Sequence, residues 1–431
     1  MFAERRERLL SAMGAGVLVV PAAPVAIRNN DVEHAYRQDS DFFYLTGFDE
    51  PESVLILTNQ HPEHQTVLFV RTRNPEREIW DGPRAGVDGA VSKFGADAAF
   101  PIDELASRLP DYLADVDRVH YRLGRDRSFD DRFFAALDVV RRRARLGTRV
   151  PTEVVDPAAT LHELRLVKGD EEVESMKRAA AVTRDAHLAA MRAARPGIHE
   201  FEVEAEMNRI FRKAGCERPA YDSILGSGRN ATILHYRKND RLMEDGDLLL
   251  IDAGCELDYY ASDVTRTFPV NGKYSEAQRA IYDLVLDSQR AAIALCVPGK
   301  TLDDIHQVAT RVIAAGLVEL GLLEGDVDTL ISDGTHKAYY MHRTSHWLGM
   351  DVHDVGAYFV DGVPRPLVPG HVLTVEPGIY IADDADCDPR WRGIGIRIED
   401  DILVTEGAPL NLTAEIPKAP DEVEAILRES R

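Results

Sequence analysis

The sequence predicts two domains, an α/β domain followed by a larger domain of mixed α and β structure. The length of 431 residues exceeds what a single hydrophobic core usually holds. Short apolar runs alternate with helical patterns up to about residue 150, and the acidic residues with ligand character are concentrated after residue 251. We therefore place the first domain at residues 1–165 and the second at residues 166–431.

The first domain is predicted from the alternation of strand-like and helical segments. β-Branched and aromatic residues dominate four short runs, which are GVLVVPA (16–22), SVLILT (53–58), TVLFVR (66–71) and VHYRL (119–123). Two segments with helical spacing are DELASRLPDYLA (103–114) and FFAALDVVRRRARL (133–146). The apolar run at 16–22 is short and ends in prolines, so we interpret it as a strand in preference to a signal peptide. Candidate ligands do not cluster in this part, and a scaffold or assembly role is expected.

A long amphipathic helix with Asp170 as its expected N-cap opens the second domain. A faint internal duplication follows, because residues 194–215 and 296–316 each contain Pro-Gly, an acidic helix start and a helix predicted to end at the final glycine. Two related halves that close on one site would contribute ligands from both halves.

Composition excludes several classes of protein. The formal net charge of −22 argues against a nucleic-acid partner, because phosphate binding needs clustered Lys and Arg. The sequence has no run approaching the roughly 18 apolar residues of a membrane span, so no membrane partner is expected. The four cysteines are far apart and form no CxxC pair, which favours a reducing cytoplasm over a disulfide framework or a zinc knuckle.

Four acidic residues and one histidine form the most informative pattern in the chain. They are Asp252 in LLLIDAG, Asp263 in ASDVTRTF, His346 in HRTSHWLGMDVHD, Glu376 in LTVEPG and Glu399 in GIGIRIEDD. Each acid interrupts or follows an apolar strand-like run, where an unpaired carboxylate is costly to bury. Four converging carboxylates would repel one another unless cations neutralised them. The pattern therefore predicts a site for two divalent metal ions.

Local geometry supports this prediction at two places. The segment from 248 to 268 is expected to form a hairpin that turns through 256–258 and brings Asp252 and Asp263 side by side. In GIGIRIED, strand alternation puts the isoleucines on one face and Gly395, Arg397 and Glu399 on the other, with Gly395 leaving room for a close approach.

Histidines surround the same segments. His342, His346 and His353 occur within a dozen residues, and His235 lies in ATILHY. The spacing of His342 and His346 is not that of a zincin helix, because Arg343 occupies the glutamate position of HExxH. We expect a loop here, followed by a strand in MDVHDV. A ligand set of oxygens with one imidazole favours Mn²⁺, with Co²⁺ or Zn²⁺ able to substitute. Two such ions about 3.5–4 Å apart can activate water for attack on a carbonyl or phosphoryl centre.

Together these residues resemble the pita-bread metallopeptidases, and the closest resemblance is to the aminopeptidase P (Xaa-Pro aminopeptidase) family. The motifs ILHY, SHWLGMDVHDVG, VLTVEPGIYI and RGIGIRIEDD carry the resemblance in the second domain. YRQDSDFFYLTGFDEPES and REIWDGPR extend it to the first domain, so it covers nearly the whole chain. The resemblance implies a pita-bread (creatinase/aminopeptidase-like) α+β catalytic domain after an α/β N-terminal domain. It implies hydrolysis of the bond before a proline in second position, by a hydroxide that bridges two metals.

The resemblance also implies roles for individual residues. Asp263 and Glu399 would bridge the two ions, Asp252 would bind one ion, and His346 and Glu376 the other. Glu376 would also accept a proton, and His353 would stabilise the oxyanion. The remaining implied site residues are His235 and His342 on the proline side of the cleft and Arg397, which would support the site. The family tends to form dimers or tetramers, and Trp80 resembles a residue that reaches a neighbouring subunit.

Other hypotheses remain open on the sequence. Prolidases share the five ligands but accept only dipeptides, and Arg365 could bind a dipeptide carboxylate. The short segment between His353 and Glu376 favours the aminopeptidase. A metal-free pita-bread binding module, or a creatinase-like enzyme without metal, would lack several of the five ligands, all of which are present. A methionine aminopeptidase fits poorly with the additional N-terminal domain.

Overall fold

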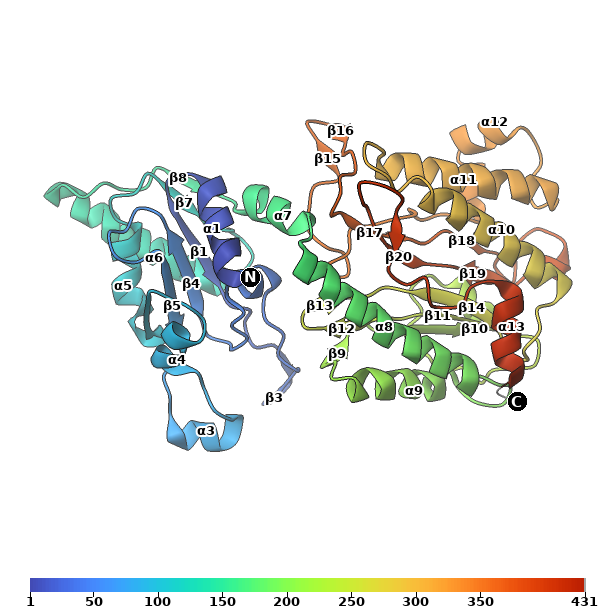
Figure 1. Cartoon of the computed structure of the whole chain (residues 1–431), viewed down its shortest axis with the longest axis horizontal. Coiled ribbons are helices and arrows are strands. Elements are labelled where there is room, and N and C mark those ends of the chain that lie inside the picture. Colours follow the sequence, from blue (N-terminus) through green and yellow to red (C-terminus); the bar gives the residue numbers. More distant parts are fainter. Residues whose placement is uncertain (430–431) are drawn as a thin grey trace. The chain divides into compact units, whose positions relative to one another are not determined.

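The computed structural model describes residues 1–429 of the chain. It contains two compact units, Met1–Leu164 and Arg165–Arg431. Figure 1 follows the chain through both units, from the N-terminus in the first to α13 near the end of the second.

The first unit is built on a six-stranded mixed sheet. In sheet order its strands are β6 (Ala98–Pro101), β5 (Thr66–Val70), β4 (Val54–Thr58), β1 (Val17–Pro21), β7 (Arg118–His120) and β8 (Glu153–Val155). β1 runs antiparallel to β4 and parallel to β7. The central strands are buried on both faces, which explains why they were visible as continuous apolar runs. All four strands predicted for this part are confirmed.

The first unit also contains helices, the last of which ends two residues beyond Leu164, in the second unit. They are α1 (Phe2–Met13), α2 (Ser40–Thr46), α3 (Pro75–Asp81), α4 (Gly86–Ser92), α5 (Leu105–Leu113), α6 (Arg127–Arg143) and α7 (Ala158–Leu166), with the turns η1 (Ile102–Glu104) and η2 (Ala144–Leu146) and the hairpin β2 (Ile27–Asn29) with β3 (Val32–Glu33). The two predicted helices are confirmed as α5 and α6. Sequence patterning did not reveal α1, because its buried stripe includes Arg5 and Arg6, whose guanidinium groups donate to the carbonyls of Tyr44 and Leu45.

The second unit contains two packed helix pairs around its strands. Its helices are α8 (Asp170–Ala193), α9 (Glu200–Lys213), α10 (Glu276–Ile293), α11 (Leu302–Glu319), α12 (Val327–Ser332) and α13 (Pro420–Glu429), with the turns η3 (Gly228–Thr232), η4 (Thr335–Ala338) and η5 (Pro389–Trp391). α8 packs on α9, and α10 packs on α11 (Figure 1). The two similar sequence segments thus each provide the second helix of a pair.

Two details of these helices differ from the sequence prediction. The N-cap of α8 is Gly169 and not Asp170, since the Glu172 carboxylate reaches back to accept from the Gly169 N–H at 3.1 Å. Gly316 does not end a helix, because α11 continues to Glu319. A Cβ at Gly316 would lie 2.2 Å from Leu284 Cδ1 on α10, so this glycine permits close helix packing. Gly215, with φ of 96°, does follow the end of α9.

The strands of the second unit form several small sheets. The sheets are β10 (Ile224–Ser227), β11 (Leu248–Asp252) and β14 (Thr265–Pro269); β9 (Arg218–Pro219), β12 (Cys255–Leu257) and β13 (Tyr260–Ala261); β17 (Val372–Val375), β20 (Asp400–Leu403) and β21 (Leu410–Asn411); β18 (Gly378–Tyr380) and β19 (Gly395–Arg397); and β15 (Phe359–Val360) and β16 (Val363–Pro364). Ile394, Ile396 and Ile398 enter the main apolar core, as strand alternation predicted.

The predicted hairpin from 248 to 268 exists as the antiparallel pair β11 and β14. Its connection is longer than expected, because β12 and β13 form a second hairpin inside it. Asp258 and Tyr259 turn this inner hairpin with φ of 51° and 68°, the left-handed conformation that a two-residue hairpin loop requires.

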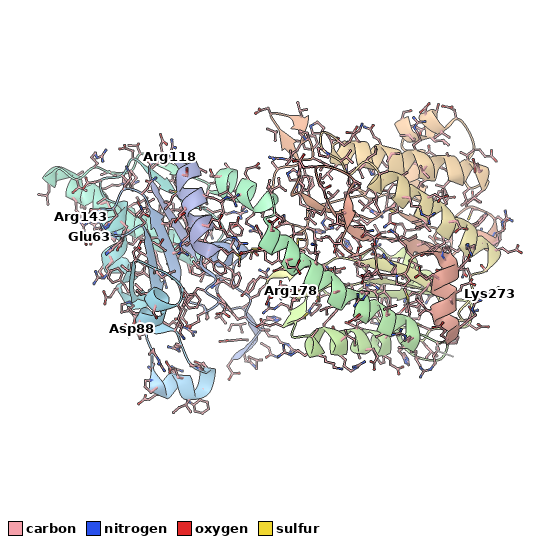
Figure 2. All side chains as sticks on the ribbon, viewed as in Figure 1. Glu63, Asp88, Arg118, Arg143, Arg178 and Lys273 are labelled. Carbon is pink, nitrogen blue, oxygen red and sulfur yellow. The ribbon has the colours of Figure 1, made fainter. Side chains whose placement is uncertain are left out.

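The structure exposes charged side chains, and its cysteines are free thiols. Charged side chains such as Glu63, Asp88, Arg178 and Lys273 are exposed (Figure 2). All four cysteines are free thiols. Among residues 1–429, the structure contains no helix with the length and apolar character that crossing a membrane would require.

Candidate metal centre and active site

The β11–β14 hairpin places the first two acids. Asp252 is the last residue of β11 and lies opposite Thr265, the first residue of β14. Asp263 lies two residues before β14, and its N–H donates to the Asp401 carboxylate at 3.2 Å. Both acids therefore occupy one end of the same pair of strands.

The C-terminal strands place the other two acids. Glu376 directly follows β17, and its N–H donates to the Thr344 carbonyl at 2.8 Å. Glu399 lies between β19 and β20 and accepts from Thr265 Oγ1 at 2.7 Å, which ties it to β14. Gly395 admits a close approach, as predicted, and the approaching group is backbone: a Cβ there would lie 2.1 Å from the Ala231 carbonyl oxygen.

His346 and His353 come from an irregular segment. Residues 341–358 form no regular helix or strand, apart from one bridge between Trp347 and Leu373. The prediction of a strand in MDVHDV is therefore wrong. The alternating polar and apolar residues there lie in turns that backbone hydrogen bonds hold in place. One of these bonds runs from the Asp354 N–H to the Trp347 carbonyl at 2.9 Å.

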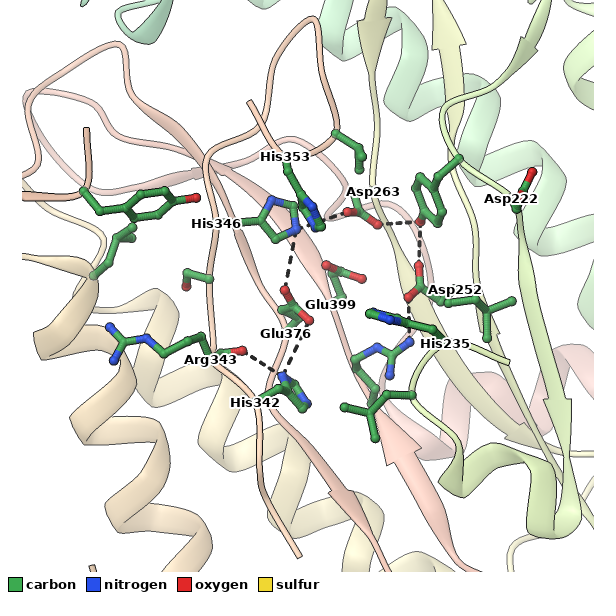
Figure 3. Close-up of a pocket in the computed structure, with 18 of the residues that line it drawn as sticks. Asp222, His235, Asp252, Asp263, His342, Arg343, His346, His353, Glu376 and Glu399 are labelled. Carbon is green, nitrogen blue, oxygen red and sulfur yellow. Dashed lines mark hydrogen bonds and ion pairs between the residues drawn. The ribbon is translucent and has the colours of Figure 1, made fainter. Parts of the chain in front are cut away.

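The site residues predicted from sequence all line one cavity of about 1010 Å³ in the second unit. These residues are His235, Asp252, Asp263, His342, His346, His353, Glu376, Arg397 and Glu399. Figure 3 shows the carboxylates of Asp252, Asp263, Glu376 and Glu399 and the imidazole of His346 gathered around a common centre. Asp263, His346 and Glu399 each offer a ligand atom, and these three atoms lie within 4.8 Å of one another.

Asp252 and Glu376 lie at the edge of this closest group. Asp252 accepts from Tyr221 at 2.6 Å and from Arg397 at 2.5 Å, which draws its oxygens toward those donors. Glu376 Oε1 lies 3.6 Å from His346 Nε2, and Asp263 Oδ2 lies 3.4 Å from the same nitrogen.

Burial and mutual repulsion oppose ionisation of several of these carboxyls. Desolvation, followed by the charges of Asp263 and Glu376, raises the pKa of Glu399 well above its ordinary value. Desolvation also raises the pKa of Glu376 to about 7 and, together with Asp263, raises the pKa of Asp252. A bound cation would remove this conflict by supplying the missing positive charge.

Burial and the surrounding charges shift the pKa values of the histidines in opposite directions. Burial alone would lower the pKa of His346, but the hydrogen bond to Asp263 and the charges of Glu376 and Asp263 raise it to about 9. Burial and the nearby Arg397 lower the pKa of His342 to about 3. Burial and His346 lower the pKa of His353, so this imidazole is neutral and can donate one N–H.

Arg397 connects the carboxylates to the histidine side of the cavity. Its guanidinium donates to Asp252, to Thr265 Oγ1 at 3.1 Å and to Tyr380 Oη at 2.8 Å. Tyr380 Oη lies 2.9 Å from His342 Nε2, and His342 Nδ1 lies 2.7 Å from the Arg343 carbonyl. The network holds His342 in one orientation next to Glu376.

Sequence reasoning missed two residues of the site. The Tyr221 hydroxyl contacts both Asp252 and Asp263, and desolvation and those carboxylates raise its pKa well above its usual value. Tyr380 links Arg397 to His342. A lone tyrosine in a polar loop or at a strand end carries no local signal of such a role. Arg365, the residue that could have bound a dipeptide carboxylate, donates to the Ala357 carbonyl at 2.7 Å and is not among the described residues that line the cavity.

The donor set fits a cation on chemical grounds. It combines oxygens with one imidazole, and His346 Nδ1 lies 3.0 Å from the Trp347 carbonyl, which directs Nε2 toward the carboxylates. Burial and mutual repulsion disfavour the anionic forms of Glu399, Glu376 and Asp252, and added positive charge would relieve this. The site is therefore suited to a divalent metal.

Comparisons with known proteins agree with this geometry. The model of metallopeptidase family M24 matches residues 174–406, and the model of the aminopeptidase P N-terminal domain matches residues 2–121. The Xaa-Pro aminopeptidase of Escherichia coli is 46% identical over 432 residues, covering 100% of this chain and 98% of that protein.

Solved structures give the same result. The chain matches aminopeptidase PepP of Pseudomonas aeruginosa with a TM-score of 0.98 and 52% identity, over 100% of this chain and 98% of that chain. It matches zinc-substituted E. coli aminopeptidase P in complex with product with a TM-score of 0.97 and 45% identity, over the same shares of the two chains.

Proposed function

Because this chain belongs to metallopeptidase family M24, with an N-terminal part of the aminopeptidase P type, we propose that it removes the first residue from peptides whose second residue is proline. The observation that carries the proposal is the convergence of four carboxylates and the His346 imidazole on a single cavity. The metal-free pita-bread alternative is disfavoured, because all five ligand positions are present and face that cavity.

The five ligands would hold two divalent cations. Asp252, Asp263, His346, Glu376 and Glu399 are the side chains that would hold them. When bound, the cations would polarise the scissile carbonyl and make water nucleophilic at neutral pH. We propose Mn²⁺ as the preferred ion, with Co²⁺ or Zn²⁺ as substitutes, because oxygen ligands dominate the set.

Glu376 would take the proton that the attacking water loses. Its carboxylate lies 3.6 Å from His346 Nε2 and 3.8 Å from His342 Nδ1, in the cavity that would hold the substrate. A carboxylate beside the attacking water can accept its proton and later release that proton to the leaving nitrogen.

His353 would donate its N–H to the carbonyl oxygen as negative charge develops. Its ring lies 4.4 Å from that of His346, centroid to centroid, at 80°. A neutral imidazole fixed there can stabilise an oxyanion without adding charge to the free site.

The proline side of the cavity combines apolar groups with two histidines. Leu234 packs against Ile224 and Tyr380, and His342 contacts Tyr380. His235 also lines this cavity. Proline has no N–H and a rigid ring, so a shaped apolar wall can recognise it where a hydrogen-bond acceptor would be unused. Arg397 would hold Asp252 and Tyr380 in place, and through Tyr380 it would also hold His342.

Two further properties belong to the same proposal. We propose a homodimer or homotetramer assembled through the first unit, supported by Trp80 on α3, whose side chain is 83% exposed with Ile79 beside it. We propose a cytoplasmic location, supported by four cysteines that all remain as thiols.

The test is digestion of a peptide library in Mn²⁺, read by mass spectrometry. Loss of one N-terminal residue only from peptides with proline second is the expected result. Parallel assays with a Xaa-Pro dipeptide and with Xaa-Pro-Xaa tripeptides separate the activity from that of a prolidase. Strict preference for the dipeptide, or no N-terminal release, would contradict the proposal.

A further inference from the structure

A buried ion-pair cluster lies behind the irregular segment that carries His346 and His353. The Asp354 carboxylate accepts from Lys168 Nζ at 2.8 Å and from Arg165 at 2.7 Å, and Arg165 also donates to Asp351 at 2.9 Å. The side chains of Asp354 and Lys168 are each 1% exposed, and that of Arg165 is 3% exposed. We call Arg165, Lys168, Asp354 and the partly exposed Asp351 the Asp354 cluster.

The two cations of this cluster come from the segment 165–168, where the second unit begins. The Lys168 N–H donates to the Gly370 carbonyl at 2.9 Å, and Leu166 is buried in a core cluster with Trp347 and Val375. Segment 165–168 is therefore anchored by backbone, apolar and ionic contacts together.

One glycine leaves space for the cluster, and a second leaves space for Leu166, which belongs to the same segment 165–168. A Cβ at Gly349 would lie 2.1 Å from Asp354 Oδ2 and 2.8 Å from Lys168 Cε. A Cβ at Gly356, where φ is +127°, would lie 2.8 Å from Leu166 Cδ1. The irregular segment is shaped around these side chains.

Short paths lead from Asp354 to both histidines. His353 precedes Asp354 directly in the chain. The Asp354 N–H donates to the Trp347 carbonyl, and the same carbonyl is the partner of His346 Nδ1 at 3.0 Å. A displacement of Asp354 would thus move His353 and disturb the group that orients His346.

The electrostatics of the cluster keep Asp354 as an anion. Burial alone would raise the pKa of Asp354, but Lys168 and Arg165 outweigh burial and hold that pKa below its ordinary value. A buried ion pair adds little net stability compared with well-packed apolar groups. Its directional contacts instead fix the positions of the groups they join. Segment 341–358 needs such contacts because no regular secondary structure fixes its conformation.

We propose that Arg165 and Lys168 are positioning residues that, through Asp354, hold His353 and His346 in the arrangement that hydrolysis requires. The consequence for turnover rests on the proposed function, whereas the placement of the histidines does not. Both cations act at a distance from the substrate, and neither lines the cavity within residues 1–429.

The test begins with Lys168→Met, which keeps side-chain length and removes the charge. At saturating Mn²⁺, kcat on a Xaa-Pro tripeptide should fall about tenfold to a hundredfold with KM within about twofold. The matched control is Asp247→Asn, which weakens the Arg241–Asp247 ion pair at the opposite end of β11. This control should lose thermal stability but retain kcat.

A double variant separates positioning from stability. The double variant Lys168→Met/Asp354→Asn removes the ammonium and the carboxylate together, so neither charge stays buried without the other. Its Tm should therefore recover, while kcat stays low. Recovery of both Tm and kcat in the double variant would overturn the proposal. So would a Lys168→Met enzyme whose kcat is within twofold of the unaltered chain.

Imidazole NMR of the metal-free protein gives a readout independent of activity. The ring signals of His353, assigned with His353→Gln, should shift in Lys168→Met and remain in place in Asp247→Asn. Unchanged signals in Lys168→Met would count against the positioning role. Absence of any Xaa-Pro cleavage by the unaltered chain would instead refute the proposed function, and the NMR result would still stand alone.

Discussion

The two units of the chain treat buried charge in different ways. In the first unit, Arg6 donates to the carbonyls of Leu45 and Gly95, and Asp39 caps α2 and pairs with Arg125. In the second unit, Asp252, Asp263 and Glu399 face one another across a cavity. These buried charges of the first unit are satisfied by donors and ion pairs, whereas the acids around the cavity of the second unit concentrate like charge that cations would neutralise.

The same contrast exists inside the second unit between two glutamates of equal burial. Glu200 is 0% exposed, and its carboxylate accepts from the Ser227 N–H at 2.6 Å, from Ser227 Oγ at 2.7 Å and from the Arg241 N–H at 2.9 Å. Glu399 is 1% exposed and accepts from Thr265 Oγ1, and the charges of Asp263, Glu376 and Asp252 outweigh that of Arg397. At equal burial, the donors and charges around the two glutamates differ, and this difference makes Glu399 the candidate ligand.

Glu399→Ala should give the largest effect. It removes a ligand shared by both expected metal positions, so bound metal should be lost and kcat should fall about a thousandfold or more, corresponding to several kcal/mol of lost transition-state stabilisation. Metal content by mass spectrometry and kcat are measured together. Glu200→Ala, the matched control, should lower Tm but keep metal and activity. Equal metal loss in both variants would erase the distinction between the two glutamates.

His353→Ala should have the next largest effect. The variant should retain metal, because the metal ligands are intact, but kcat should fall about a hundredfold from loss of one oxyanion donor. Steady-state kinetics at saturating Mn²⁺ measures the effect. Normal turnover would remove His353 from the mechanism.

Metal affinity should rise with pH. His346 has a pKa of about 9 in the metal-free site, so near pH 7 it holds a proton that a metal ion must displace. Its raised pKa stabilises the metal-free fold below pH 6.5, and this contribution is lost as pH rises through about 9. Apparent affinity should therefore increase at least about tenfold per pH unit between pH 7 and 9, because His346 releases one proton and ligand carboxyls with raised pKa values can release more. Competition with a chelating dye measures it, and an affinity independent of pH would contradict the assignment.

Glu399→Gln should have the smallest effect. It should stabilise the metal-free protein, whereas most substitutions in a protein core destabilise it. Burial and Asp263 raise the pKa of Glu399 well above its ordinary value, so an ionised Glu399 opposes folding of the metal-free protein. The neutral amide removes that cost and should stabilise the metal-free protein by on the order of 1 kcal/mol. Urea denaturation in a chelator measures the change. Glu200→Gln should destabilise the protein by about 1 kcal/mol, because it weakens satisfied hydrogen bonds.

The elements that the sequence revealed are those with strong periodicity or complete burial. β1, β4 and β5 were visible as apolar runs, and the alternation in GIGIRIED correctly assigned the faces of Ile396 and Arg397. α1 was missed because buried arginines satisfy backbone carbonyls from α2. The strand expected in MDVHDV was wrong because alternation there serves turns and an ion-pair cluster.

The sequence by itself determined which side chains are the candidates for the chemistry, because carboxylates at the ends of apolar strands are costly to bury unless something neutralises or satisfies them. Only the tertiary structure decided how they are held. Tyr221 contacts two of the acids, Tyr380 joins Arg397 to His342, and Lys168 reaches Asp354 from 186 residues away. Such contacts depend on the packing of distant segments, and no local pattern of residues specifies where a single hydroxyl or ammonium group will end.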